Sequence, residues 1–111
     1  MSHLDEQEFR RHADDALTKL YRVLTDASDD YGFDADLQDG AITIELDDPP
    51  GKFVISPNTP ARQVWVAARS KSYKLDWDEV QSTFVLGETG PTLKTLVEEA
   101  LGKHIGEEVN L

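Results

Sequence analysis

Acidic side chains crowd one short stretch of the sequence, and they are the residues best suited to hold a metal ion. The stretch has no basic residue, and its aspartates are Asp26, Asp29, Asp30, Asp34, Asp36 and Asp39. Carboxylate oxygens are preferred ligands of hard cations. A calcium loop of the EF-hand type is excluded, because counting from Asp26 puts Tyr31 and Leu37 where such a loop needs glycine and glutamate. The stretch predicts either open, weak binding of hard cations through oxygen and water or a merely solvated acidic surface.

A second group of candidate ligands comes near the N-terminus. Spacings of three and four place Asp5, Glu8, His12 and Asp15 on one flank of a helix. An imidazole among carboxylates is a donor set that can help hold Fe(II), and a solvated helix side is the alternative interpretation. His104 falls on an apolar stripe, which is typical of a packed core residue.

The charge of the chain is polarised along its length. The net charge is −11, and the first fifty residues carry −10 of it, with fourteen acids against Arg10, Arg11, Lys19 and Arg22. The other sixty-one residues carry eight acids and seven bases. Such self-repulsion destabilises a compact fold, so a metal ion or a basic protein surface is the expected ligand of the acidic end. The same charge argues against binding of nucleic acid, whose phosphates need lysine and arginine.

The residue inventory removes several kinds of site. The sequence has no cysteine, so the chain cannot ligate an iron–sulfur cluster through thiolates, and a metal must be held by oxygen or by His3, His12 or His104. No Gly-rich phosphate loop, nucleophile elbow or His-Glu-x-x-His pair is present, so we expect no catalytic activity. The longest apolar run is five residues, too short to span a bilayer, and the N-terminus carries no export signal. We therefore expect a cytoplasmic protein without a membrane partner.

Hydrophobic periodicity predicts the elements of the first half. Apolar residues recur at spacings of three and four over residues 4–26, which predicts an amphipathic helix, and this period is lost over 27–40. Alternation over 33–37 predicts a strand with one acidic face. Asp39 and Gly40 are typical of a type I′ hairpin turn, and 41–46 is the expected return strand.

The second half continues the sheet and ends in a helix. A break is expected at 48–51, and the further predicted strands are 52–56, 63–68, 73–77 and 83–86, with turns at 57–60, 69–72 and 78–82. A helical stripe over 93–104 follows, with Gly106 as its stop. The sequence thus predicts one α+β domain over residues 1–111. We expect an α-β sandwich with two helices packed on one face of an antiparallel sheet of about six strands.

Strand alternation divides the side chains of 63–68 between two faces. The valines on either side of Trp65 suit a helix-covered core, so Trp65 falls on the open face of the sheet together with Gln63. An aromatic side chain on an open face beside Arg62 and Gln63 is typical of an anchor for a protein partner. The position of Trp77 stays undecided.

Two segments of the chain resemble the signature strands of the frataxin family. They are Ser56-Pro57-Asn58-Thr59-Pro60-Ala61-Arg62-Gln63-Val64-Trp65-Val66-Ala67 and Tyr73-Lys74-Leu75-Asp76-Trp77. Other matching residues follow in the family's order and spacing: Phe9 with Ala13-Asp14, the hairpin Asp39-Gly40-Ala41-Ile42-Thr43-Ile44, and Gly90 with Leu93 and Leu96. The resemblance covers nearly the whole chain. The chain is short and has no targeting extension, and in this it is similar to bacterial members of the family.

The resemblance implies a protein that binds iron weakly on an acidic ridge made by the first helix and first strand. Carried over residue by residue, the ridge positions that keep a carboxylate are Asp14, Asp26, Asp30, Asp34 and Asp36, with Asp29 nearby. The family acts in iron–sulfur cluster assembly and docks on a cysteine desulfurase and its scaffold protein. The partner-facing positions that match are Gln63 and Trp65, beside Arg62. We expect a monomer, with metal-induced oligomers as a further state.

The chain departs from the family pattern at four positions. Tyr21, Arg22 and Thr25 stand where the ridge is usually acidic, so the loop and strand must carry more of the charge. Ser56 replaces a usual asparagine, which weakens one expected polar contact with the partner. Two rival functions stay open: an acidic module that binds a basic partner surface without metal, and a ferroxidase, for which a di-iron site would need Glu-x-x-His pairs on facing helices.

Overall fold

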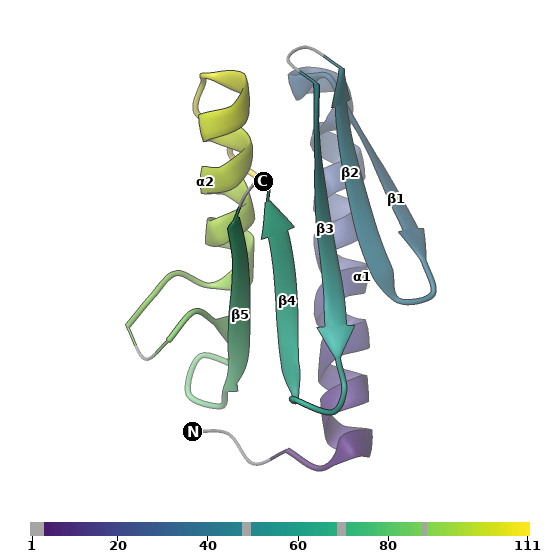
Figure 1. The fold of residues 1–111 in the computed structure, drawn as a ribbon, viewed down its shortest axis with the longest axis vertical. Coiled ribbons are helices and arrows are strands. Elements are labelled where there is room, and N and C mark those ends of the chain that lie inside the picture. The colour runs from purple at the N-terminus through teal and green to yellow at the C-terminus, as the bar shows by residue number, and fades with distance from the viewer. Residues whose placement is uncertain (1–3, 48–49, 69–70, 88) are drawn as a thin grey trace.

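The chain folds into one layer of helices against one layer of strands (Figure 1). The computed structural model describes residues 4–47, 50–68, 71–87 and 89–111. Within these residues the elements are α1 (Glu6–Tyr31), β1 (Phe33–Gln38), β2 (Ala41–Asp47), β3 (Pro50–Asn58), β4 (Gln63–Ala68), β5 (Lys71–Asp78), β6 (Thr83–Val85) and α2 (Leu93–Ile105). Neither of these helices is long and apolar enough to cross a membrane.

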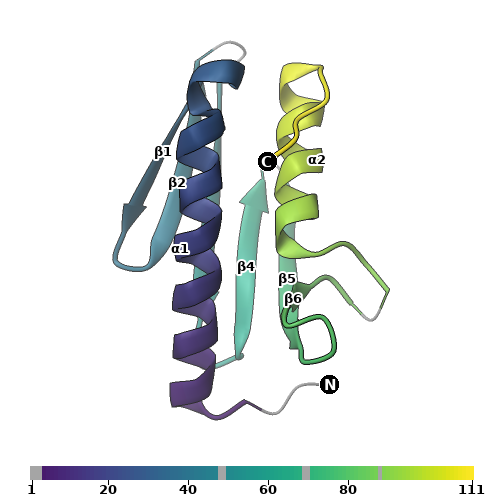
Figure 2. The same cartoon turned by 180° about the vertical axis from the view of Figure 1, so that it is seen from behind.

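The sheet is a simple antiparallel meander. Its strands lie in sequence order, β1-β2-β3-β4-β5-β6, and each pairs with the next in antiparallel register. Both helices cover the same face of this sheet, with α1 beside β1 and β2 and with α2 over the other side (Figure 2). The α+β sandwich expected from the sequence is confirmed. The opposite face of the sheet, turned toward the viewer in Figure 1, is the open face.

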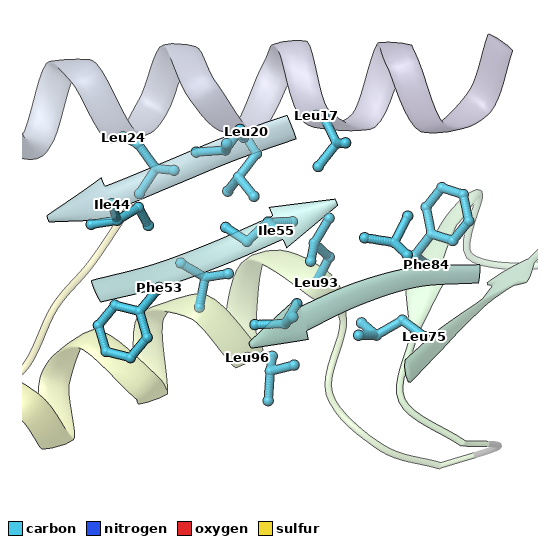
Figure 3. Close-up of a cluster of buried hydrophobic side chains, with 14 of the residues drawn as sticks. Leu17, Leu20, Leu24, Ile44, Phe53, Ile55, Leu75, Phe84, Leu93 and Leu96 are labelled. Atoms are coloured by element: carbon cyan, nitrogen blue, oxygen red, sulfur yellow. The ribbon is translucent and has the colours of Figure 1, made fainter. Parts of the chain in front are cut away.

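The core lies between the two layers, because each strand turns its aliphatic side chains toward the helices. Alternation in β2 buries Ile42, Ile44 and Leu46 and leaves the residues between them at the surface. The apolar stripe of α1, with Leu17, Leu20 and Leu24, packs onto these strands (Figure 3). A second stripe, from α2, brings Leu93, Leu96 and Leu101 against the same core.

The first helix is longer than the sequence pattern predicted. We expected it to end near Asp26, yet α1 continues to Tyr31. Ala27 is buried and Tyr31 is half-buried, so the core-facing stripe runs on past Leu24 at spacings of three and four. Gly32 then ends the helix in the left-handed conformation with φ of 70°, and its N–H donates to the Ser28 carbonyl. The predicted loop after residue 26 is therefore helix.

Several strand boundaries also differ from the prediction. The expected break at 48–51 is wrong in part, because Pro50 and Gly51 begin β3 and pair with Asp47 and Leu46; residues 48 and 49 lie outside the described residues. Strand β3 runs on through Asn58, and β5 starts at Lys71, where a turn was expected. Cross-strand pairing extended these strands through residues that single-sequence patterns assign to turns.

The predicted turn and helix stop are confirmed. Asp39 and Gly40 have φ of 53° and 79°, which are the positive values that a type I′ hairpin needs. Gly106 ends α2 with φ of 79°. His104 is buried, as expected, and its ring meets that of Phe53 edge to face with centroids 5.7 Å apart. A Cβ at Gly51 would lie 2.2 Å from the His104 ring, so this approach requires glycine.

Candidate functional site

Five of the predicted iron ligands lie in the last two turns of α1 or in β1, on either side of Gly32. Asp26, Asp29 and Asp30 occupy the last two turns of α1, and Asp34 and Asp36 alternate along β1 on the open face. All five side chains are exposed. We call these five residues the ridge cluster.

Asp14 does not belong to this cluster. It precedes Asp26 by twelve residues, which is about 18 Å along the axis of a helix. It lies instead beside the turn between β1 and β2, in an open depression of about 550 Å³ that Arg10, Arg11 and Gly40 also line. Two positively charged arginines beside a single carboxylate disfavour the binding of a metal ion. Five of the six predicted ligands therefore lie near the junction of α1 and β1, and no three of them are placed to share one metal ion.

The ridge cluster collects negative charge at an unfavourable place. The C-terminal end of a helix carries a partial negative charge, and the last turn of the 26-residue helix α1 has no basic residue. A charge in the last turn of a helix typically changes stability by about 0.3–1 kcal/mol at low salt, and for Asp29 and Asp30 the sign is unfavourable. The ion pairs described on this helix, Arg10 with Glu6 at 3.4 Å and Lys19 with Asp15 at 3.0 Å, do not include the cluster. A bound cation would relieve this repulsion.

The cluster is open rather than a cage. Within the described part of the chain, no group of three or more acidic or histidine side chains is placed to hold one metal ion. Asp34 and Asp36 are two residues apart on one strand face, which separates them by about 7 Å. A cation here would contact one or two carboxylates and complete its coordination shell with water. We therefore expect any binding of a cation here to be weak.

Two acidic residues of β2 extend the charge and were missed in the sequence. Glu45 lies directly opposite Asp34 in the register of β1 and β2, and both Glu45 and Asp47 are exposed on the open face. Like charges opposite each other destabilise a strand pair. The sequence does carry a signal for these acids, because they alternate with aliphatic residues along the strand. We used that alternation only to predict which residues enter the core. The acidic surface therefore spans β1 and β2.

A second candidate surface lies in the middle of the open face. Trp65 is half-buried, and its neighbours Val64 and Val66 are buried under the helices, so the predicted division of faces is confirmed. The indole Nε1–H donates to Gln63 Oε1 at 3.0 Å, and Gln63 Nε2–H donates to Asp76 Oδ1 at 3.2 Å. The Lys74 ammonium lies 5.0 Å from the centre of the Trp65 ring. We call Gln63, Trp65, Lys74 and Asp76 the Trp65 patch.

Arg62, the third residue predicted to face a partner, makes contacts inside the molecule. Its Nε–H donates to the Leu4 carbonyl at 3.3 Å, and its Nη1–H donates to the Thr59 carbonyl. These bonds join the chain before α1 to the turn between β3 and β4. The half-buried guanidinium is thus a structural clamp, and its role at an interface stays a prediction.

The structure gives surroundings for the four positions that depart from the family pattern. Arg22 and Thr25 are exposed on α1 between Asp14 and the ridge cluster, and Tyr21 is half-buried against the core. Ser56 lies opposite Trp65 in the register of β3 and β4. Between Asp14 and Asp26, these positions of α1 therefore add no carboxylate to the ridge, and serine borders the Trp65 patch.

The second group of candidate ligands is not a metal site in this structure. Asp5 is the N-cap of α1, where its Oδ1 accepts the Glu8 backbone N–H at 2.8 Å, and this bond lowers the pKa of the Asp5 carboxyl. Asp15 pairs with Lys19. The His12 ring stacks on Trp77 with centroids 3.9 Å apart and planes 20° apart. These contacts favour the alternative interpretation, in which the four residues form a solvated side of the helix and hold no metal.

The stacking with His12 also settles the position of Trp77. It lies on the helix-covered side of the sheet, where its ring meets Phe84 edge to face at 5.2 Å. The next residue, Asp78, caps the turn to β6, and hydrogen bonds from Gln81 hold the pKa of its carboxyl below the ordinary value. The two tryptophans therefore differ in role, since Trp77 packs between layers and Trp65 faces outward.

Comparison with known protein families matches residues 2–107 of this chain to the frataxin-like domain. Among curated proteins, mitochondrial frataxin of Arabidopsis thaliana is 31% identical over 112 residues, which cover 97% of this chain and 59% of the plant protein. The iron-sulfur cluster assembly protein CyaY of Azotobacter vinelandii is 30% identical over 107 residues, which cover 96% of this chain and 94% of that protein. The chain thus spans under two thirds of the plant protein and nearly all of the bacterial one.

Solved structures show the same fold. The frataxin of Psychromonas ingrahamii superposes with a TM-score of 0.74 over 96% of this chain and 97% of that one, at 23% sequence identity. The sandwich described above is thus the fold of that protein.

Proposed function

The chain belongs to the frataxin family, and from that premise we propose that it is an iron-binding accessory protein of iron–sulfur cluster assembly. Its bacterial relatives are named iron-sulfur cluster assembly proteins rather than enzymes, which supports an assembly role without catalysis. This bacterial similarity also supports our placing it in the cytoplasm. The observation that carries the proposal is the ridge cluster, whose exposed carboxylates accumulate at the negative end of α1.

We propose that iron is cargo held loosely on the ridge cluster. Fe(II) and Fe(III) are cations for which carboxylate and water are adequate ligands, and each binding event offsets part of the repulsion at the helix end. Because the cluster supplies one or two carboxylates to any one ion, the affinity is low and falls as salt screens the field. Weak binding suits a protein that gives its metal away.

Docking would use both surfaces. The acidic surface of α1, β1 and β2 is complementary to a basic patch, which we propose lies on the cysteine desulfurase. The Trp65 patch offers a half-buried aromatic anchor, which we propose contacts the scaffold protein. The protein acts as a monomer in this proposal, because the two surfaces are then both available to partners.

An NMR titration of the protein with Fe(II) tests the metal site. The amides between Asp26 and Asp36 should move first and reach saturation, and added salt should weaken the change. A variant with Asp26, Asp30 and Asp34 changed to asparagine should lose the response. The control variant carries Glu98, Glu99 and Glu107 changed to glutamine, which removes equal charge near the other terminus.

The rival function, an acidic module without metal, makes a different prediction for this titration. It would show no saturable site at millimolar Fe(II), while still binding a basic partner. Resonances of α2 or β5 moving before those of the ridge cluster would place the metal elsewhere and contradict the proposed site.

A further inference from the structure

The Trp65 indole is held at two points, by its edge and by its face. Its Nε1–H donates to Gln63 Oε1 at 3.0 Å, and the Lys74 ammonium lies over the ring at 5.0 Å from its centre. Lys74 is directly opposite Trp65 in the register of β4 and β5. A hydrogen bond in the ring plane and a cation above it restrain different motions of the side chain. Together they define the orientation of the indole on an otherwise open face.

Asp76 orients the Gln63 side chain, which in turn orients Trp65. It lies directly opposite Gln63, and its Oδ1 accepts the Gln63 Nε2–H at 3.2 Å. A carboxylate only accepts hydrogen bonds and an indole N–H only donates them, so the group between them must do both. A glutamine amide meets this need, and its orientation is dictated by its two neighbours. Glutamate at position 63 would accept from the indole but repel Asp76.

We call the contacts of Gln63, Asp76 and Lys74 that hold the Trp65 ring the relay. The relay contributes little to the stability of the fold. Lys74 and Asp76 are exposed, and Gln63 and Trp65 are half-buried on the face that no helix covers. Hydrogen bonds and charged contacts open to water contribute little to stability. The contacts instead remove the rotameric freedom of an aromatic side chain before a partner arrives, and ordering such side chains is part of the cost of association.

We propose that Asp76, Gln63 and Lys74 are positioning residues that pre-organise Trp65 for docking. The inference rests on the proposed function, because it assigns Trp65 to the interface with the scaffold protein. It adds the chemistry of the contact. Since the indole N–H is already bonded within the molecule, the partner needs to supply apolar surface to Trp65 rather than a hydrogen-bond acceptor.

The first experiment needs no partner. In a ¹H–¹⁵N spectrum of the protein, the Trp65 indole Nε1–H signal should shift and broaden in Asp76→Ala and in Gln63→Glu. The Trp77 indole signal should stay in place and serves as the internal reference. Asp76→Asn should restore the wild-type signal, because its Oδ1 still accepts from Gln63. An unchanged Trp65 signal in Asp76→Ala would overturn the relay.

The second experiment measures affinity for the assembled desulfurase and scaffold protein. Asp76→Ala should weaken binding about two- to tenfold, as expected for one side chain that must be ordered on docking, with an unchanged melting temperature. Asp76→Asn should retain most of the affinity. Glu79→Ala removes an exposed acid nearby without touching the relay and should bind like the wild type.

The outcomes separate the relay from the function on which it rests. Altered Trp65 signals together with wild-type affinity in Asp76→Ala would overturn the docking role of the relay. Equal losses in Asp76→Ala and Glu79→Ala would assign the effect to charge and also overturn it. If the wild-type protein did not bind the complex at all, the proposed function would fail, and the docking role of the relay with it.

Discussion

The ridge cluster and the Trp65 patch are both polar surfaces, yet they hold their side chains in opposite ways. The carboxylates of Asp26, Asp29 and Asp30 stand in solvent at a helix end that offers them no basic neighbour in the last turn. In the Trp65 patch, the Trp65 indole donates to Gln63 at 3.0 Å, and Gln63 donates in turn to Asp76 at 3.2 Å. One region concentrates charge without fixing it, and the other fixes a few side chains.

This difference indicates how each region should act. Charge without fixed geometry acts over a Debye length, about 10 Å at 0.1 M salt, and tolerates rearrangement of its members. A fixed aromatic ring acts only in contact, where its position matters. The ridge cluster should therefore govern capture of cations and the rate of association, and the Trp65 patch should govern how long a complex lasts.

The largest effect should come from removing the aromatic ring. Trp65→Ala should weaken binding to the desulfurase and scaffold protein by about 2 kcal/mol or more, mainly through a faster off-rate. The far-UV circular dichroism spectrum and the Fe(II) titration should stay unchanged, because the side chain lies outside the core and far from the ridge cluster. Surface plasmon resonance gives the two rate constants.

Two results would break the comparison at this point. An unfolded Trp65→Ala variant would show that the ring is part of the core after all. Unchanged affinity would show that the open face is not the docking surface. Trp65→Phe is the matched variant, and it should bind better than Trp65→Ala because the apolar surface is retained.

Reversing charge in the ridge cluster should affect the rate of association. Changing Asp26 and Asp30 to lysine should slow association by about tenfold at low salt and flatten its dependence on salt, with little change in the off-rate. The control changes Glu107 and Glu108 to lysine, which alters net charge equally on exposed residues near the other terminus. Equal slowing in both variants would mean that total charge, rather than its placement, guides association.

The fold could be predicted from the sequence because the spacing of its apolar residues is regular along most of the chain. Alternation in β2 and β4, the Asp39-Gly40 turn and the stripe of α2 all agree with their tertiary surroundings. The end of α1 did not follow, since closely spaced aspartates have low helix propensity and obscured a stripe that continues through Ala27 to Tyr31. Packing against the sheet outweighed local propensity there, and it changed the predicted acidic loop into helix.

The candidate sites were predictable to different degrees for the same physical reason. Alternation is a local property, so it placed Trp65 on the open face correctly. The contacts of Asp76 and Lys74 with the Trp65 patch depend on the register of β4 and β5, which a single sequence does not reveal. Likewise, the opposition of Glu45 and Asp34 appears only when β1 and β2 are paired.

A smaller effect should appear in stability. Asp30→Asn should raise the free energy of unfolding by a few tenths to about 1 kcal/mol, because it removes a negative charge from the negative end of α1. Glu6→Gln should have the opposite sign, since Glu6 is in the first turn and pairs with Arg10. Urea denaturation at low salt measures both. A clear loss of stability in Asp30→Asn would indicate a structural role for that carboxylate.

The smallest effect concerns a carboxylate that has partners, which sharpens the contrast with the ridge cluster. The hydrogen bond from the Glu8 backbone N–H, and to a lesser extent the charge of Arg62, lowers the pKa of the Asp5 carboxyl from its ordinary value. Because the folded-state pKa lies below the unfolded one, this ionisation stabilises the fold above the unfolded pKa, and the contribution is lost as pH falls through the folded one. Asp5→Asn keeps an oxygen that can cap the helix but cannot ionise. The advantage of the wild type over Asp5→Asn, measured by denaturant unfolding from about pH 5 to about pH 2, should therefore shrink as the acid is protonated. A difference that stays constant over this range would mean that the cap acts through its oxygen alone and that charge at Asp5 contributes nothing to the start of α1.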